Sequence, residues 1–120
     1  MSPQLIFHGT YGKEDPERAI LPFIVGNVAV TADQKAIIFL TVEGVRLATK
    51  GYADNISKEG FPVLKELMQS FISNGGKIWA CGACTKPRGI TDADLIEGAQ
   101  IVTAANLVEQ LVSGSVSCTL

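Results

Sequence analysis

Short apolar runs alternate with longer amphipathic segments along the 120 residues of the chain. Residues 35–42 form the clearest run, and their continuous β-branched and aromatic side chains predict a parallel strand that is covered on both faces. Shorter runs predict a buried strand at residues 4–8 and two more strands, at residues 77–80 and 99–102. Residues 115–120 are strand-like and are expected to form a fifth strand at the edge of the sheet.

Helical periodicity fills the intervals between these runs. The first helix is predicted from an Asp-Pro-Glu start at residue 15 to about residue 31, with Pro22 and Gly26 inside it expected to bend or weaken it. Proline opens the second helix, at residues 62–74, whose apolar residues recur on one stripe, and a third helix is predicted at residues 104–112. Shorter helical turns are predicted at residues 45–48 and 91–94, and a polar loop at residues 51–60.

The alternation of strands and helices determines the expected fold class. A β-α-β-α-β-(α)-β-α-β order predicts an α/β fold in which a mainly parallel sheet lies between layers of helices. No internal repeat, low-complexity tract or linker divides the sequence. Its length is that of one ordinary domain, so residues 1–120 are expected to fold as a single unit.

The amino-acid composition limits the kinds of partner that the protein is expected to bind. Apolar residues make up 47% of the chain and charged residues only 18%, which suggests that a second copy covers part of the apolar surface. The net charge is −2 and the ten Lys and Arg residues are scattered, which disfavours binding to nucleic acid. No apolar run approaches the roughly 20 residues of a membrane span. The N-terminus lacks the pattern of a secretory signal, so we expect a cytoplasmic protein without a membrane partner.

The most informative candidate chemistry is a Cys-x-x-Cys pair. Cys81 and Cys84 follow the third predicted strand, and sites in open parallel sheets collect at the carboxyl ends of strands. A reactive thiolate needs nearby cations or a helix N-terminus, and Lys86, Arg88 and the predicted helix start near Thr91 follow closely. The pattern therefore predicts thiol chemistry at Cys81 and Cys84.

The sequence also allows other roles for the cysteines. A free cysteine often only fills space in a core, and Cys118, near the end of a strand-like run, is assigned to that role. Thioredoxin-like exchange would require the pair to follow an early strand and open a long helix. A closed zinc site needs four ligands, and only the three cysteines and His8 are available, so no metal is expected.

Further polar residues lie at the predicted strand ends. His8 is the only histidine, and it is a candidate base, a partner that orients a thiol, or simply a hydrogen-bonded strand end. His8, Thr10 and Glu43 are the candidate ligand-binding residues. No phosphate-binding or dinucleotide-binding glycine motif is present, so no cofactor is expected.

Several segments together resemble the DsrE/DsrF-like family. The resemblance covers nearly the whole chain, and its most specific part lies between Cys81 and Gly98. It implies a three-layer α/β/α sandwich with a mainly parallel five-stranded sheet, and assembly into homotrimers or homohexamers. The segments that carry it are Glu-Asp-Pro-Glu-Arg-Ala at 14–19, Glu-Gly-Val at 43–45, Gly-Phe-Pro at 60–62, Cys-Gly-Ala-Cys at 81–84, Arg-Gly-Ile at 88–90 and Asp-Leu-Ile-Glu-Gly at 94–98.

The resemblance also implies roles for the cysteine segment. Sulfur-relay members of the family carry a cysteine at the position of Cys81, where it accepts sulfur as a persulfide and passes it to a partner thiol. By that resemblance Arg88 would favour the Cys81 thiolate. Cys84 has no counterpart in the relay proteins and resembles instead the second cysteine of a stand-alone branch that is loosely described as peroxiredoxin-like. In this chain, Cys84 could resolve a persulfide or sulfenate on Cys81.

Three functions therefore follow as hypotheses from the sequence. The first is a sulfurtransferase-like carrier that exchanges sulfane sulfur with donor and acceptor proteins through Cys81. The second is a non-enzymatic, oligomeric protein that binds a small ligand. The third is a thiol-redox protein that uses Cys81 and Cys84 as a pair.

Overall fold

A computed structural model describes residues 2–120 and contains one sheet of five parallel strands. The strands lie in the order β4-β3-β2-β1-β5, so β2 is central and β4 and β5 are the edges. This arrangement confirms the predicted parallel sheet and the predicted edge strand. The strands are β1 (Leu5–Gly9), β2 (Ala36–Leu40), β3 (Lys77–Cys81), β4 (Ala99–Val102) and β5 (Val116–Thr119).

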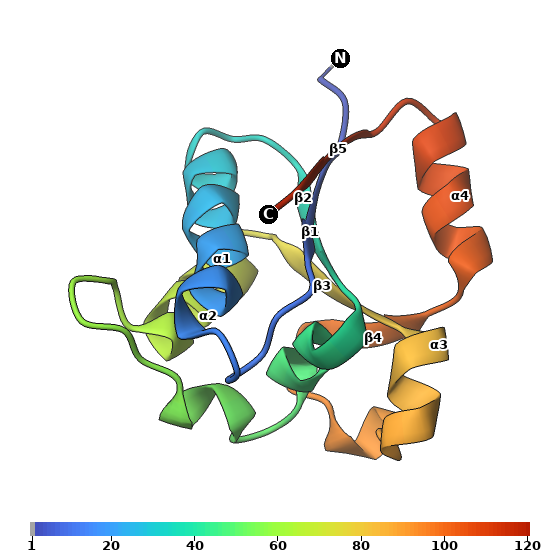
Figure 1. Cartoon of the computed structure of the whole chain (residues 1–120). Helices are drawn as coiled ribbons and strands as arrows, with labels where there is room; N and C mark the ends of the chain where they lie inside the picture. Colours follow the sequence, from blue (N-terminus) through green and yellow to red (C-terminus); the bar gives the residue numbers. More distant parts are fainter. Residues whose placement is uncertain (1) are drawn as a thin grey trace.

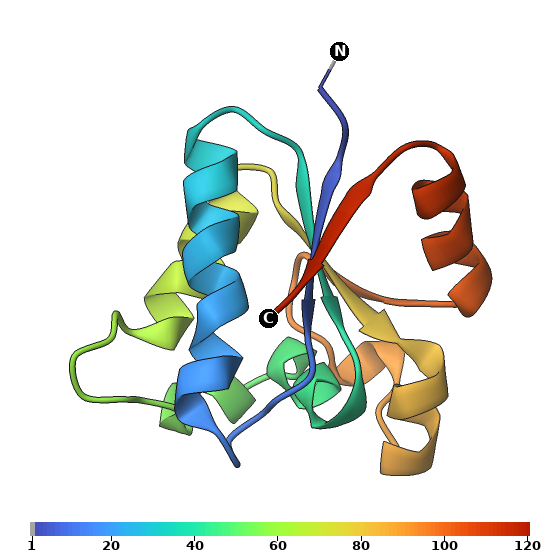
Figure 2. The same ribbon diagram turned by 45° about the horizontal axis from the view of Figure 1, so that its top comes forward.

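Helices lie on both faces of the sheet, which confirms the three-layer α/β/α architecture. Figure 2 shows α1 (Pro16–Thr31) and α2 (Leu64–Ser73) on one side, and α3 (Gly82–Thr85) and α4 (Ala104–Val112) on the other. Figure 1 shows the same layers from another side. Four 3₁₀ segments complete the chain: η1 (Val42–Ala48), η2 (Tyr52–Asn55), η3 (Lys86–Arg88) and η4 (Asp92–Asp94). No helix in the described part of the chain is long and apolar enough to cross a membrane.

The two faces of the sheet are buried to different extents. On the α1 and α2 side, Phe23 and Phe71 are fully buried and meet edge to face, with ring centroids 6.3 Å apart. Gly26 lets the two helices approach, because an added Cβ would lie 3.0 Å from Phe71. The opposite face holds a smaller apolar cluster around Phe39 and Trp79, and every residue of α4 stays at least partly exposed.

Several predicted boundaries were wrong, each for a local reason. The strand predicted at 35–42 ends at Leu40, because Val42 adopts a left-handed backbone with φ of 56° and begins η1. The second helix begins at Leu64 rather than at Pro62, because Val63 is still extended. The segment predicted as a loop at 51–60 contains η2. The first helix is continuous through Pro22 and Gly26.

Candidate functional site

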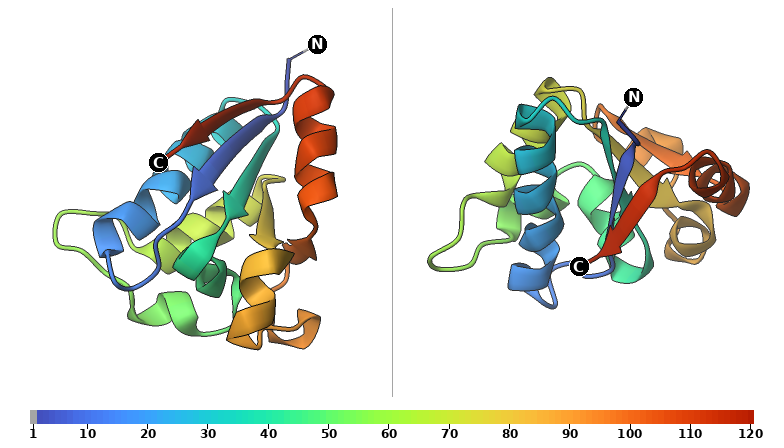
Figure 3. Two further views of the ribbon diagram at one scale, coloured as in Figure 1. Left: turned by 45° about the vertical axis from the view of Figure 1, so that its right-hand side comes forward. Right: turned by 90° about the horizontal axis from the view of Figure 1, so that it is seen from above.

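Cys81 is the last residue of β3, at the carboxyl edge of the sheet. The left view of Figure 3 shows β2 and β3 leading into η1 and α3 at this edge. Cys81 is half-buried, contacts the apolar clusters on both faces of the sheet, and occupies the N-cap position of α3. Its side chain makes no capping hydrogen bond. The thiol therefore lies where a buried strand gives way to the first turn of a short helix.

Cys84 lies one turn further along, inside α3. The sequence predicted only that the Cys-x-x-Cys pair follows a strand, and the structure shows that the pair spans the start of a short helix. The backbone N–H of Val42 donates a hydrogen bond to Cys84 Sγ at 3.1 Å. Valine rarely adopts a positive φ, so this donor is held in a conformation that the side chain disfavours. Cys84 is thus a cysteine whose sulfur is held by a fixed backbone donor.

An ion-paired cluster joins η1 to the cysteine segment. Glu43 accepts a hydrogen bond from Arg88 Nε at 2.8 Å and another from Arg46 Nε at 2.7 Å. Arg88 also donates to the carbonyl oxygen of Cys84 at 3.0 Å. The hydrogen bond from Arg88, followed by that from Arg46, lowers the pKa of Glu43 below its ordinary value. Glu43 and Arg88 were predicted separately, as a ligand residue and a thiolate partner, and here they pair with each other.

His8 lies on β1, on the other side of β2 from Cys81. Its Nε2 is hydrogen-bonded to Thr41 Oγ1 at 2.6 Å and its Nδ1 to Thr119 Oγ1 at 3.2 Å. The ring is tilted against Phe39 with centroids 5.5 Å apart, and burial lowers the pKa of His8 below its ordinary value. Both ring nitrogens are therefore engaged within the protein. Thr10 is joined to η1, because its carbonyl accepts the N–H of Gly44 at 3.2 Å.

The four potential zinc ligands do not come together. Cys118 was predicted to fill space in the core, and this was wrong, because it is exposed on the edge strand β5, which is separated from β3 by β2 and β1. Within residues 2–120, no group of three or more His, Cys, Asp or Glu side chains is arranged to hold a metal ion. All three cysteines are unpaired thiols.

Some residues contribute to the site through a hydrogen bond or an ion pair and were not predicted from the sequence. Val42 was predicted as the last residue of a strand. Its side chain gives no sign that its backbone N–H donates a hydrogen bond to a cysteine sulfur. Thr41 lay inside the strand predicted at 35–42, and its contact with His8 at the strand end became visible only because β2 ends at Leu40. Arg46 lies three residues after Glu43 in a predicted helical turn, which is the spacing of an ion pair.

Comparison with known proteins supports the resemblance. The uncharacterized protein MJ0760 of Methanocaldococcus jannaschii is 33% identical over 108 residues, which are 90% of this chain and 39% of that protein. The chain thus spans well under half of that relative. The uncharacterized protein MK0008 of Methanopyrus kandleri is 33% identical over 104 residues, which are 87% of this chain and 80% of that protein.

Solved structures show the same fold at low sequence identity. The ychN protein from E. coli superposes with a TM-score of 0.82 at 17% identity, covering 99% of this chain and all (100%) of that chain. The protein of unknown function MTH1491 from Methanobacterium thermoautotrophicum gives a TM-score of 0.72, also at 17% identity, covering 99% of this chain and 100% of that chain. Residues 4–115 match the DsrE/DsrF-like family. Because that match covers almost the whole of the five-stranded domain, the chain belongs to the DsrE/DsrF-like family.

Proposed function

We propose that this protein carries sulfane sulfur as a persulfide on Cys81. Membership of a family linked to sulfur relay supports the proposal. The observation that carries it is the position of Cys81, a half-buried thiol at a strand end and at the N-cap of α3. Open parallel sheets place their reactive groups at this edge.

The proposed step needs one bond to form and one to break. The Cys81 thiolate attacks the outer sulfur of a donor persulfide, R–S–SH, and forms a new S–S bond. The donor's own S–S bond breaks, and the donor leaves as the thiolate RS⁻. An acceptor thiolate then repeats the exchange on the outer sulfur of Cys81, so no external oxidant is required. The proposal places the protein in the cytosol, where unpaired cysteines stay reduced.

Mass spectrometry tests this proposal directly. After incubation with a small-molecule persulfide and removal of the excess, the intact chain is expected to gain the mass of one sulfur atom. Peptide mapping is expected to locate that sulfur on Cys81, because this is the cysteine at the strand end. The Cys81→Ser variant should gain nothing. Equal loading of that variant, or no loading of Cys81 in either the wild type or the Cys84→Ser variant, would reject the proposal.

A second candidate function is a thiol-redox pair of Cys81 and Cys84. The observation that favours it is the hydrogen bond from the Val42 N–H to Cys84 Sγ, because such a donor fixes the position of that sulfur. The two residues are also three positions apart across a helix start, the arrangement of Cys-x-x-Cys redox motifs. No comparable observation favours a binding protein at this edge, because His8 and Glu43 make their hydrogen bonds within the protein.

We also propose that the protein assembles from several identical chains, as a homotrimer or homohexamer, through α4 and β5. The side chains of Val108, Leu111, Val112 and Val116 are exposed, and Val112 is 82% exposed. A nine-residue helix without a buried residue gains little from tertiary packing, which is the usual source of helix stability. A second copy of this chain would cover both the helix and the open edge of β5.

Substitution on α4 tests this assembly. The Val112→Glu variant is expected to shift the protein to the monomer, because the interface would bury an unpaired carboxylate. Light scattering after size exclusion reports the mass in solution. Val28→Glu on α1 is the matched control, since Val28 is also exposed and lies on the opposite side of the sheet. A wild-type protein that is monomeric at high concentration would contradict the proposal.

A further inference from the structure

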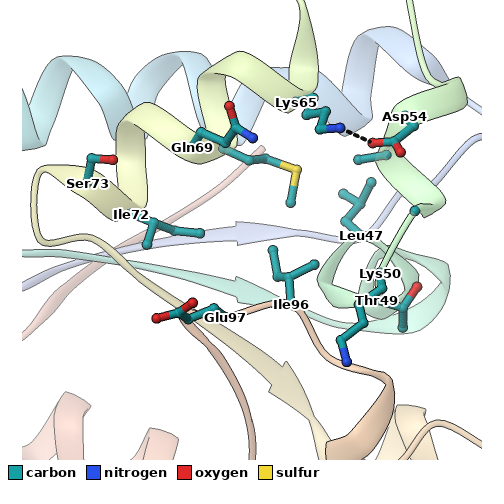
Figure 4. Close-up of a pocket in the computed structure, with 14 residues that line it drawn as sticks. Leu47, Thr49, Lys50, Asp54, Lys65, Gln69, Ile72, Ser73, Ile96 and Glu97 are labelled. Atoms are coloured by element: carbon teal, nitrogen blue, oxygen red, sulfur yellow. Dashed lines mark ion pairs between the residues drawn. The ribbon is translucent and has the colours of Figure 1, made fainter.

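A pocket of about 680 Å³ lies beside α2, away from the cysteine segment. Figure 4 shows that its walls come from α2, from η1 and η2, and from the segment that precedes β4. None of Cys81, Cys84, Glu43 or Arg88 lines it. Its volume is within the range of pockets that hold small organic molecules. The pocket is therefore separate from the cysteine segment, and its own residues determine what it can bind.

The interior of the pocket is apolar. Met68 is 4% exposed and Leu47 is 1% exposed, so the floor belongs to the hydrophobic core. Figure 4 shows Ile72 on α2 and Ile96 on the opposite wall, and Met68 of α2 also lines the pocket. Methionine adapts its shape to an apolar neighbour at small cost, because its side chain is unbranched and polarisable. An apolar ligand therefore fits the floor of this pocket better than a polar ligand does.

The rim of the pocket is polar and electrically balanced. Lys65 and Asp54 form an ion pair at 3.4 Å across one end. The other two charged lining residues, Lys50 and Glu97, carry opposite charges, and Lys50 Nζ donates to the carbonyl of Ala93 at 3.2 Å. Two cations and two anions leave no excess of either sign, so the rim offers no net attraction to an ion.

From this combination we propose that the pocket binds an uncharged, mostly apolar small molecule, of about the size of two to three fused or linked rings. The apolar floor supplies the affinity, because it removes apolar surface of the ligand from water. The balanced rim supplies the selectivity, because a charged ligand would lose hydration without gaining a partner. The site goes beyond the proposed sulfur chemistry and does not depend on it.

Two fluorescent probes with the same ring system test the proposal. N-phenyl-1-naphthylamine is uncharged, and its 8-sulfonate carries one negative charge. The uncharged probe is expected to bind with a saturable, blue-shifted emission, and at least about tenfold more tightly than the sulfonate. Equal or tighter binding of the sulfonate would overturn the proposed selectivity.

Methionine NMR locates the bound probe. The sequence contains two methionines, Met1 and Met68, so ¹³C-methyl labelling gives one resonance from the pocket. The Met68 signal is expected to shift along the same titration curve as the fluorescence. A probe that saturates without moving Met68 would place binding elsewhere and overturn the proposal. A Met68 signal that shifts with protein concentration alone, in a protein that binds no probe, would mean that a second copy occupies the pocket.

Matched variants separate this site from other apolar surface and from the thiols. Ile72→Gln is expected to weaken binding of the uncharged probe by about fivefold or more, because it removes one apolar wall. Val112→Gln on α4 is the control, and loss of binding there would show that the probe binds the exposed helix instead. The double variant Cys81→Ser/Cys84→Ser is expected to bind the probe normally. A failed sulfur-loading experiment therefore leaves this test intact.

Discussion

Replacing Phe71 by alanine is expected to lower the free energy of unfolding by about 3–5 kcal/mol. The ring is fully buried and contacts Phe23 edge to face, so its removal leaves a cavity between α1 and α2. The cavity cannot close easily, because Gly26 and Gly76 already lie against the ring with no side chain of their own to fill it. Urea denaturation followed by circular dichroism measures the change.

The same substitution at Phe61 is the matched control. Phe61 is only partly buried, in the loop that leads to α2, so its ring buries less apolar surface than that of Phe71. We expect its loss to cost about 1 kcal/mol. If the two variants lowered the free energy of unfolding by similar amounts, the contact between α1 and α2 would not be the centre of the core.

The elements that the sequence predicted well are those whose local signals agree with their tertiary role. The helix at residues 104–112 has the predicted bounds, because Thr103 caps its start by accepting the N–H of Asn106 and Gly114 follows its end. The strand at 99–102 is likewise as predicted. Where propensity, capping and turn residues all favour one structure, tertiary contacts need not overrule any of them.

The carboxyl edge of the sheet was less predictable because it depends on backbone conformation and on pairing. Val42 has a strong preference for strands, and its left-handed φ is imposed by the start of η1. The proximity of Cys81 to Cys84 follows from their spacing alone. The contact between Glu43 and Arg88, 45 residues apart, depends on how η1 and η3 meet. To predict such contacts, one must know how the elements are arranged in space and not only which elements form.

That arrangement gives the two cysteines different surroundings. Cys81 ends a strand and its side chain caps nothing, whereas Cys84 receives a backbone donor and its carbonyl is held by Arg88. A thiol that must accept sulfur from a donor needs access, and a thiol that attacks its neighbour needs a fixed position. On the proposed function, we therefore expect Cys81 to be the residue that is loaded and Cys84, whose sulfur is held by the Val42 N–H, to be the residue that responds.

The Cys84→Ser variant is expected to load sulfur on Cys81 normally but to release hydrosulfide at least about tenfold more slowly than the wild type. In the wild type, the Cys84 thiolate would attack the inner sulfur of the Cys81 persulfide. The bond between the two cysteines forms, the persulfide bond breaks, and HS⁻ leaves. A neighbouring thiolate at high effective concentration makes this step fast, and serine cannot replace it.

Hydrosulfide release after removal of the donor, followed with a sulfide electrode, measures this difference. The wild type should end as a Cys81–Cys84 disulfide that has lost two hydrogens, whereas the variant should keep its extra sulfur until an external thiol is added. Cys118→Ser is the matched control, because Cys118 is exposed on β5, far along the sheet from β3. If Cys84→Ser releases hydrosulfide as fast as the wild type, the redox pair fails. Cys81 would then act as a carrier alone, and the Val42 N–H would serve only to join η1 to α3.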